Sequence, residues 1–127
     1  MKPLALLLSL LAGCTSSPSA RDGVACEPAD PTRPRAAPLL IGGTELVRWR
    51  LDSLAAPGRP ASLAVADVFV GVRGRADSVR VVRNTSGVAD AEVAARFSRT
   101  EWQPGDARGR PARFRCRVSV PFGGAAP

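Results

Sequence analysis

Cysteine carries the most reactive side chain of this sequence, and it occurs three times, as Cys14, Cys26 and Cys116. The 127 residues include no histidine, the side chain that most often serves as a general base. The Asp and Glu residues are scattered, and no two stand at a spacing typical of paired catalytic carboxylates. Without histidine, Cys26 and Cys116 fall short of a zinc site, which takes three or four protein ligands. We therefore expect neither an enzyme nor a bound metal or cofactor.

The first fourteen residues have the layout of an export signal. Lys2 supplies a positive charge, and residues 4–11 form an apolar run that only Ser9 interrupts. A helix that crosses a membrane needs about 20 apolar residues, so this run is too short to be a lasting span. Its length is typical of a secretory signal peptide.

The end of this segment, Leu-Ala-Gly-Cys at residues 11–14, resembles the lipobox of bacterial lipoproteins. The resemblance implies cleavage before Cys14 and attachment of acyl chains to it, and two or more chains give stable anchoring to a membrane. Thr15, rather than Asp, follows the cysteine, which implies the outer membrane and a domain that faces the periplasm. The alternative is an ordinary signal peptide in which Cys14 is accidental.

With Cys14 lipidated, Cys26 and Cys116 are the remaining pair, in a compartment that favours disulfides. A bond between them would close a loop of 90 residues and stabilise the fold by roughly 4–5 kcal/mol on a chain-entropy treatment. The alternative is two free thiols, with Cys116 as an ordinary core residue.

Arginine dominates the charge of the chain. The net charge is +7, and it falls by one to +6 when Lys2, the one lysine, is removed with the signal peptide. An exported protein rarely meets nucleic acid, so we expect no nucleic-acid partner. Anionic lipid, lipopolysaccharide or an acidic protein are the available anions. The alternative is that the abundance of Arg, Ala, Gly and Pro reflects a GC-rich genome and not a function of the charge.

Composition divides the chain into four segments. We expect residues 1–13 to be the signal peptide and residues 14–38 to be a tether that begins at the cysteine whose lipidation the lipobox implies. This tether has five prolines and few large apolar residues. Such a composition favours an extended, semi-rigid spacer. Residues 39–122 form the single folded domain, and residues 123–127 form a flexible tail.

Alternation and helical spacing predict four elements within the domain. Residues 63–72 and 77–83 are Val-rich strands, joined through the turn Arg73-Gly74-Arg75 into a hairpin. Residues 89–99 have helical spacing, with acidic residues in the first turn. Residues 113–120 alternate between Arg or Ser and apolar side chains, which predicts a final strand.

This β-β-α-β order predicts an α+β fold with a three-stranded antiparallel sheet. The helix returns the chain so that the third strand runs antiparallel to the first and pairs beside it, which gives the order 2-1-3. The helix packs on one face of the sheet. The final strand is then an exposed edge, and its arginines discourage aggregation.

The domain resembles the C-terminal domain of the TonB energy-transducer family over residues 39–122. The resemblance is carried by the sequences VGVRGRADSVRVVRNTSG at 70–87 and EWQPGDARGRPARFRCRVSVPF at 101–122, and by LIGGTEL at 40–46. The matching positions are Gly74, Val79, Val81, Val82, Ser86, Gly87, Trp102, Pro104, Gly109, Pro111, Val120, Pro121 and Phe122. Residues 44–54 fit both a strand and a helix, and the resemblance favours a short helix.

The resemblance implies a protein partner. The family's domain binds a short segment at the start of an outer-membrane receptor's plug by β-strand addition, in which backbone hydrogen bonds supply the affinity. The implied contact residues are Trp102, Gln103, Arg113, Phe114, Arg115, Cys116, Arg117, Val118, Ser119 and Val120. The alternatives are that Trp102 is a core or hinge aromatic and that the arginines form a solvated face. The open edge would also permit a homodimer.

The chain departs from energy transducers in lacking a lasting membrane helix, any histidine and a long proline-rich spacer. We therefore expect an adaptor in TonB-dependent uptake rather than a transducer of force. The alternative is a structural envelope lipoprotein whose basic domain binds lipopolysaccharide or other anionic envelope polymers. Binding that weakens strongly with added salt would indicate this alternative.

Overall fold

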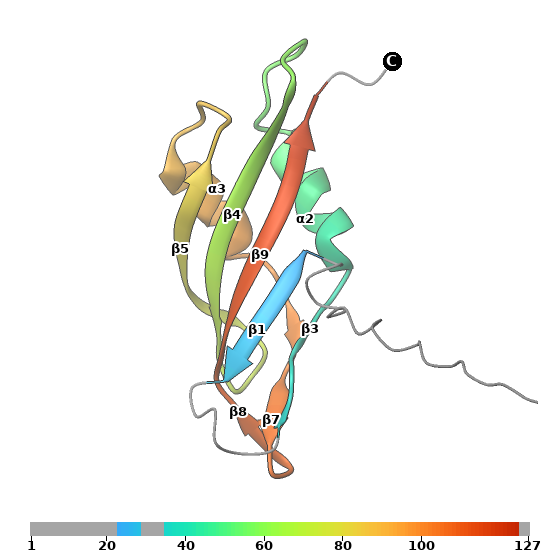
Figure 1. The fold of residues 1–127 in the computed structure, drawn as a ribbon, viewed down its shortest axis with the longest axis vertical. Helices are drawn as coiled ribbons and strands as arrows, with labels where there is room; N and C mark the ends of the chain where they lie inside the picture. Colours follow the sequence, from blue (N-terminus) through green and yellow to red (C-terminus); the bar gives the residue numbers. More distant parts are fainter. Residues whose placement is uncertain (1–22, 29–34, 125–127) are drawn as a thin grey trace, which may run out of the picture.

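A four-stranded antiparallel sheet with two helices behind it forms the body of the protein (Figure 1). The computed structural model describes residues 23–28 and 35–124. In chain order its elements are β1 (Val24–Pro28), β2 (Arg35–Ala36), β3 (Leu39–Leu40), α2 (Gly43–Asp52), β4 (Ala61–Val70), β5 (Ala76–Asn84), α3 (Asp90–Phe97), β6 (Trp102–Gln103), β7 (Gly105–Ala107), β8 (Arg110–Ala112) and β9 (Phe114–Gly123). The α+β class and the antiparallel pairing are as predicted.

The order of the main sheet is β1-β9-β4-β5. Its three longer strands are those that the sequence predicts, and they stand in the predicted order, with β4 between β5 and β9. The prediction of three strands is wrong, because β1 adds a fourth beside β9. For the same reason β9 is an internal strand and not an edge.

The core lies between the sheet and the two helices. Alternate residues of β4 and β9 point to this face, because side chains in a strand alternate between its two sides. Val93 and Phe97 of α3 pack over β4 and β5, while Val47 and Leu51 of α2 pack over β9. The fully buried strand residues are Ala64, Ala66, Val68, Cys116, Val118, Val120 and Phe122, with Val70 and Phe114 almost so.

Residues 43–52 form a helix, which resolves the ambiguity of this segment. Val47 and Leu51 are 2% and 0% exposed, whereas Trp49 is 72% exposed. A strand would have placed all three side chains on one face. Helical spacing places Trp49 opposite the buried pair, on the side away from the core.

Two smaller sheets lie beside the lower end of the main sheet, and the sequence did not predict them (Figure 1). β3 pairs with β6, and β2, β7 and β8 form a three-stranded sheet. Arg108 and Gly109 join β7 to β8 with φ values of 57° and 78°. Positive φ at both central residues of a two-residue loop is the signature of a type I′ turn, which suits the twist of a hairpin.

Part of the predicted tether is structured. Val24–Pro28 and Arg35–Ala36 form β1 and β2, and Gly123, expected in the flexible tail, is the last residue of β9. Cys14, the signal segment and residues 125–127 lie outside the described residues. Within residues 23–28 and 35–124, no helix has the length and apolar character needed to cross a membrane.

Candidate functional site

The edge of β9 that was predicted to receive a partner is covered by β1. The antiparallel register runs from Val24 opposite Val118 to Pro28 opposite Phe114. Side chains of β1 alternate between half-buried positions on the core side and the exposed Ala25 and Glu27 on the other side. β1 is therefore a strand added to β9 by the chain itself, and the expected open edge is corrected.

A disulfide joins Cys26 to Cys116 across these two strands. The two cysteines are directly opposite in the register, with Cα atoms 4.0 Å apart at a sequence separation of 90. Antiparallel partners that exchange no backbone hydrogen bonds approach this closely. The structure therefore brings the two cysteines to bonding distance, as the predicted disulfide requires.

Further contacts hold β1 in place on either side of the disulfide. Glu27 forms an ion pair with Arg115 on the neighbouring strand. The backbone N–H of Ser119 donates to the carbonyl oxygen of Gly23 at 2.7 Å, one residue before β1 begins. β1 is thus bound to β9 by main chain, side chain and covalent bond together.

Beyond β1, the same edge of β9 offers no open donor. Backbone groups of alternate residues point to the same side of a strand, so Pro121 and Gly123 follow Ser119 on this edge. Pro121 has no N–H to donate. The N–H of Gly123 donates to the Asp52 carboxylate of α2 at 2.7 Å. Along its whole length, this side of β9 is paired or lacks a donor.

The ten predicted contact residues separate into two groups. Trp102, Phe114, Cys116, Val118 and Val120 belong to the buried core, whereas Gln103, Arg113, Arg115 and Arg117 are exposed and Ser119 is half-buried. The indole N–H of Trp102 donates to the Thr100 hydroxyl at 2.9 Å. Trp102 is therefore a core aromatic and does not line a surface site.

The face of the sheet away from the helices carries a buried acid that the sequence analysis missed. Asp67 of β4 is 4% exposed, although it lies on the solvent side. Arg117 of β9 donates to both carboxylate oxygens, from Nε at 2.8 Å and from Nη2 at 3.1 Å. These hydrogen bonds lower the pKa of Asp67, and the positive charges of Arg117, Arg115 and Arg80 add to the effect. The available signal was an acidic residue inside the apolar run LAVADVFV.

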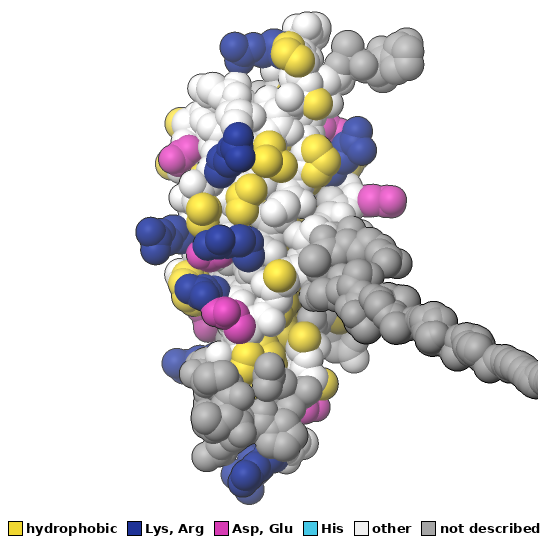
Figure 2. Space-filling view, viewed as in Figure 1, with side chains coloured by type: hydrophobic (Ala, Val, Ile, Leu, Met, Phe, Trp, Pro, Cys, Tyr) yellow, Lys and Arg dark blue, Asp and Glu magenta, His cyan; other side chains and the backbone are white. Residues whose placement is uncertain are grey.

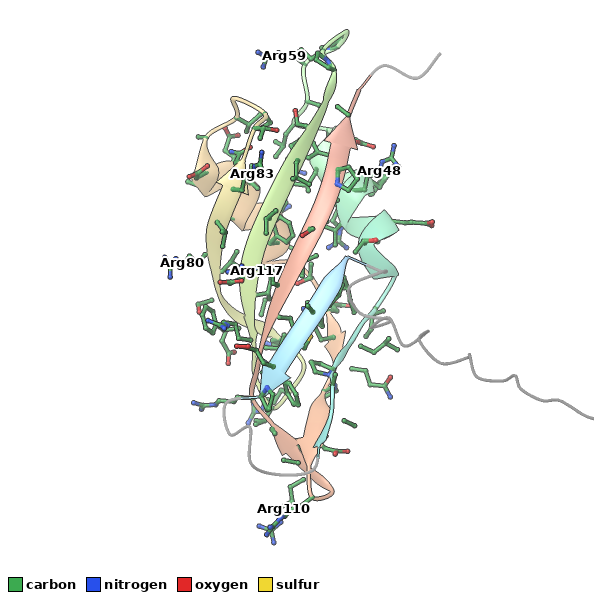
Figure 3. All side chains as sticks on the ribbon, viewed as in Figure 1. Arg48, Arg59, Arg80, Arg83, Arg110 and Arg117 are labelled. Carbon is green, nitrogen blue, oxygen red and sulfur yellow. A yellow bond between two sulfur atoms is a disulfide. The ribbon has the colours of Figure 1, made fainter. Side chains whose placement is uncertain are left out.

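Arginines gather on this open face of the sheet (Figure 2, Figure 3). Arg80 of β5 lies opposite Asp67, and Arg83 lies opposite Val65. Apolar side chains stand between the arginines, with Phe69 39% and Val82 44% exposed. Among the carboxylates that the structure describes, only Asp67 and Glu27 form ion pairs with arginines of this face.

A pocket of about 530 Å³ lies at the end of this face near the β4–β5 turn. Its apolar surface comes from Phe69, Val70 and Phe114, and its charged rim from residues of both signs. The charged lining residues are Glu27, Asp77, Arg113 and Arg115. In the part of the chain that the structure describes, no three His, Cys, Asp or Glu residues are grouped so as to hold a metal ion.

No protein-family model, no curated protein and no solved structure matched the chain in the comparisons with known proteins. The resemblance to the TonB C-terminal domain therefore stays a prediction from the sequence.

Proposed function

We propose that this protein is a lipid-anchored envelope adaptor that binds an extended segment of a partner protein by pairing it with β9. The observation that carries the proposal is the pairing of β1, because the chain's own segment occupies the edge of β9 as an added antiparallel strand. Strand addition supplies affinity through main-chain hydrogen bonds and selectivity through alternate side chains. The sequence resemblance makes the plug segment of a TonB-dependent receptor the candidate partner.

β9 suits this role better than β5, which is the edge strand at the opposite side of the main sheet. The β4–β5 ladder shifts register between Val65 and Ala66, which marks a bulge near Val82 of β5. Arg80 and Arg83 flank this bulge and are exposed. Bulges and charged side chains are devices that discourage pairing at an open edge. β5 is therefore the protected edge.

The occupant of β9 defines what a partner segment must present. Val24, Cys26 and Pro28 are half-buried on the core side, so a partner needs small or apolar residues at alternate positions. Between them, Glu27 pairs with Arg115, so an acidic residue is favoured on the open face. The preferred segment is therefore extended, alternates small or apolar residues with polar ones, and carries an acidic side chain on the open face of the sheet.

An NMR titration tests the proposal. The mature chain with Cys14→Ser is ¹⁵N-labelled, its disulfide is reduced, and peptides from the plug starts of the host's receptors are added. Shifts confined to β1 and β9 that persist at moderate salt would support strand pairing at this edge. Shifts confined to β5 would place binding at the wrong edge, and no shifts with any peptide would remove the proposal.

The lipid anchor is tested separately, because Cys14 lies outside the described residues. Mass spectrometry of protein from the bacterial membrane fraction should find a chain that begins at an acylated Cys14. The Cys14→Ser variant should lose both the acyl mass and the membrane association. An unmodified Cys14 in the mature protein would contradict the anchor.

The arginines of the open sheet face favour a second candidate function, the binding of lipopolysaccharide or another anionic envelope polymer. Arg80 and Arg83 lie along β5 on this face, whereas Arg48 lies on α2 (Figure 3). Binding of lipopolysaccharide that falls steeply with salt and is weakened by Arg80→Gln and Arg83→Gln would support this candidate. Arg48→Gln is the matched control, and an equal loss in all three variants would indicate only net charge.

A further inference from the structure

β1 and the proposed partner compete for one edge, so the bond that holds β1 decides whether a partner can bind. We infer that the Cys26–Cys116 disulfide controls access to β9, and that its reduction by a dithiol frees this edge for a partner strand. The inference rests on the proposed function and adds the regulation of that site.

The disulfide prevents exchange of the occupant while it is intact. Cys26 is the central residue of the five in β1 and is bonded directly across to Cys116. A strand fixed at its centre can neither leave nor change its register, since a shift by one residue would turn its side chains to the other face. Without the bond, β1 still competes for the edge of β9 because it belongs to the same chain. A partner strand then needs only to bind this edge more favourably than β1 does at its effective local concentration.

β1 contributes little to the buried core. All the buried hydrophobic residues of the described chain lie in other elements, and Val24 and Cys26 only border that cluster. Of the main sheet, β1 pairs with β9 alone, at the margin (Figure 1). Release of β1 therefore leaves β9, β4, β5 and both helices packed.

The reductive step is an ordinary thiol–disulfide exchange. A thiolate of the dithiol attacks Sγ of Cys26, which is half-buried, whereas Cys116 is 0% exposed. The S–S bond breaks, a mixed disulfide forms, and Cys116 leaves as a thiolate that takes up a proton. The second thiol of the reductant then displaces Cys26, which also becomes a thiol, and the two electrons come from the dithiol.

Hydrogen exchange measures the opening of the edge without any ligand. The amides of Arg115 and Arg117 point toward β1, and that of Val118 points toward β4, because Ser119 donates to Gly23 and successive residues alternate. We expect exchange at Arg115 and Arg117 to rise on reduction by at least about tenfold more than exchange at Val118, whose rise reports only the lower global stability. Cys26→Ser should reproduce the difference without a reductant. An equal change at all three amides in both samples would overturn the inference.

Peptide binding to the same samples separates this inference from the proposed function. The plug peptides are titrated into oxidised protein, reduced protein and Cys26→Ser, all as the mature chain with Cys14→Ser. Binding at least about tenfold tighter after reduction, and in Cys26→Ser, would support the inference. Equal binding in the oxidised protein would overturn the inference and leave the proposed function in place. An edge that opens but binds no peptide would overturn the proposed function, and its regulation with it.

Discussion

Replacement of Asp67 by asparagine tests the account of the open sheet face. The carboxylate is 4% exposed and accepts hydrogen bonds from Nε and Nη2 of Arg117 at 2.8 and 3.1 Å. Asparagine has nearly the same shape, but its amide nitrogen would oppose one N–H donor of the guanidinium. The variant therefore loses one hydrogen bond and the negative charge that Arg80 and Arg115 also stabilise.

The expected loss of unfolding free energy at neutral pH is about 1–2 kcal/mol. A hydrogen bond to a charged group contributes roughly 1.5–3 kcal/mol. The lower end applies here, since the Arg117 side chain is 53% exposed and solvent screens the pair. Urea denaturation of the oxidised protein measures the difference. Asp77→Asn, at an exposed position of β5, is the control and should change stability by less than about 0.5 kcal/mol.

The stabilisation by Asp67 should depend on pH in one direction only. The folded pKa of Asp67 is lowered below the unfolded value of about 3.9, so the unfolded state binds more protons in that range. The stabilisation is complete above the unfolded pKa and is lost as the pH falls through the folded pKa. The difference between wild type and Asp67→Asn should therefore shrink in acid. A difference that does not vary with pH, or one no larger than that of Asp77→Asn, would show that the ionised Asp67 carboxylate does not stabilise the fold.

Three further predictions concern the turns, the core and the disulfide, and urea denaturation checks each. Gly74 has φ of 81° and a Cβ there would overlap the carbonyl of Trp102, whereas at Gly109, with φ of 78°, nothing lies within 4 Å. Gly109→Ala should cost about 1–2 kcal/mol and Gly74→Ala clearly more, so equal costs would contradict the close approach. Trp102→Phe should lower the unfolding free energy by about 1 kcal/mol or more, because the hydrogen bond to Thr100 is lost. The tryptophan fluorescence that remains should be the red-shifted emission of the exposed Trp49. Reduction of the disulfide should lower the unfolding free energy by about 4–5 kcal/mol on the chain-entropy treatment, and no change would mean that it never formed.

The elements that the sequence predicted well are those with a repeated local pattern. Alternation in β4 and β9 and helical spacing in α3 each recur over several residues, so pattern alone identified the buried faces. The same argument separated Val47 and Leu51 from Trp49 once the helix was known. The order of β5, β4 and β9 followed from the direction in which the helix returns the chain.

The candidate site was predicted less well, because it depends on pairing between distant residues. β9 was identified as a strand, but its status as an edge depends on whether another segment covers it. That segment, Val24–Pro28, is short and lies among prolines, so its composition indicated a spacer. It becomes a strand only because β9 supplies hydrogen-bonding partners about 90 residues away.

Local sequence patterns were sufficient to predict the α+β class, three of the four strands of the main sheet and their order, and to identify Cys26 and Cys116 as the candidate disulfide pair. Contacts between distant segments place β1 against β9, bring the two cysteines into register, and pair Asp67 with Arg117. The physical reason is that periodic burial is a local property of the chain. Which strand lies next to which, and which charges meet across them, is fixed only when the sheet assembles.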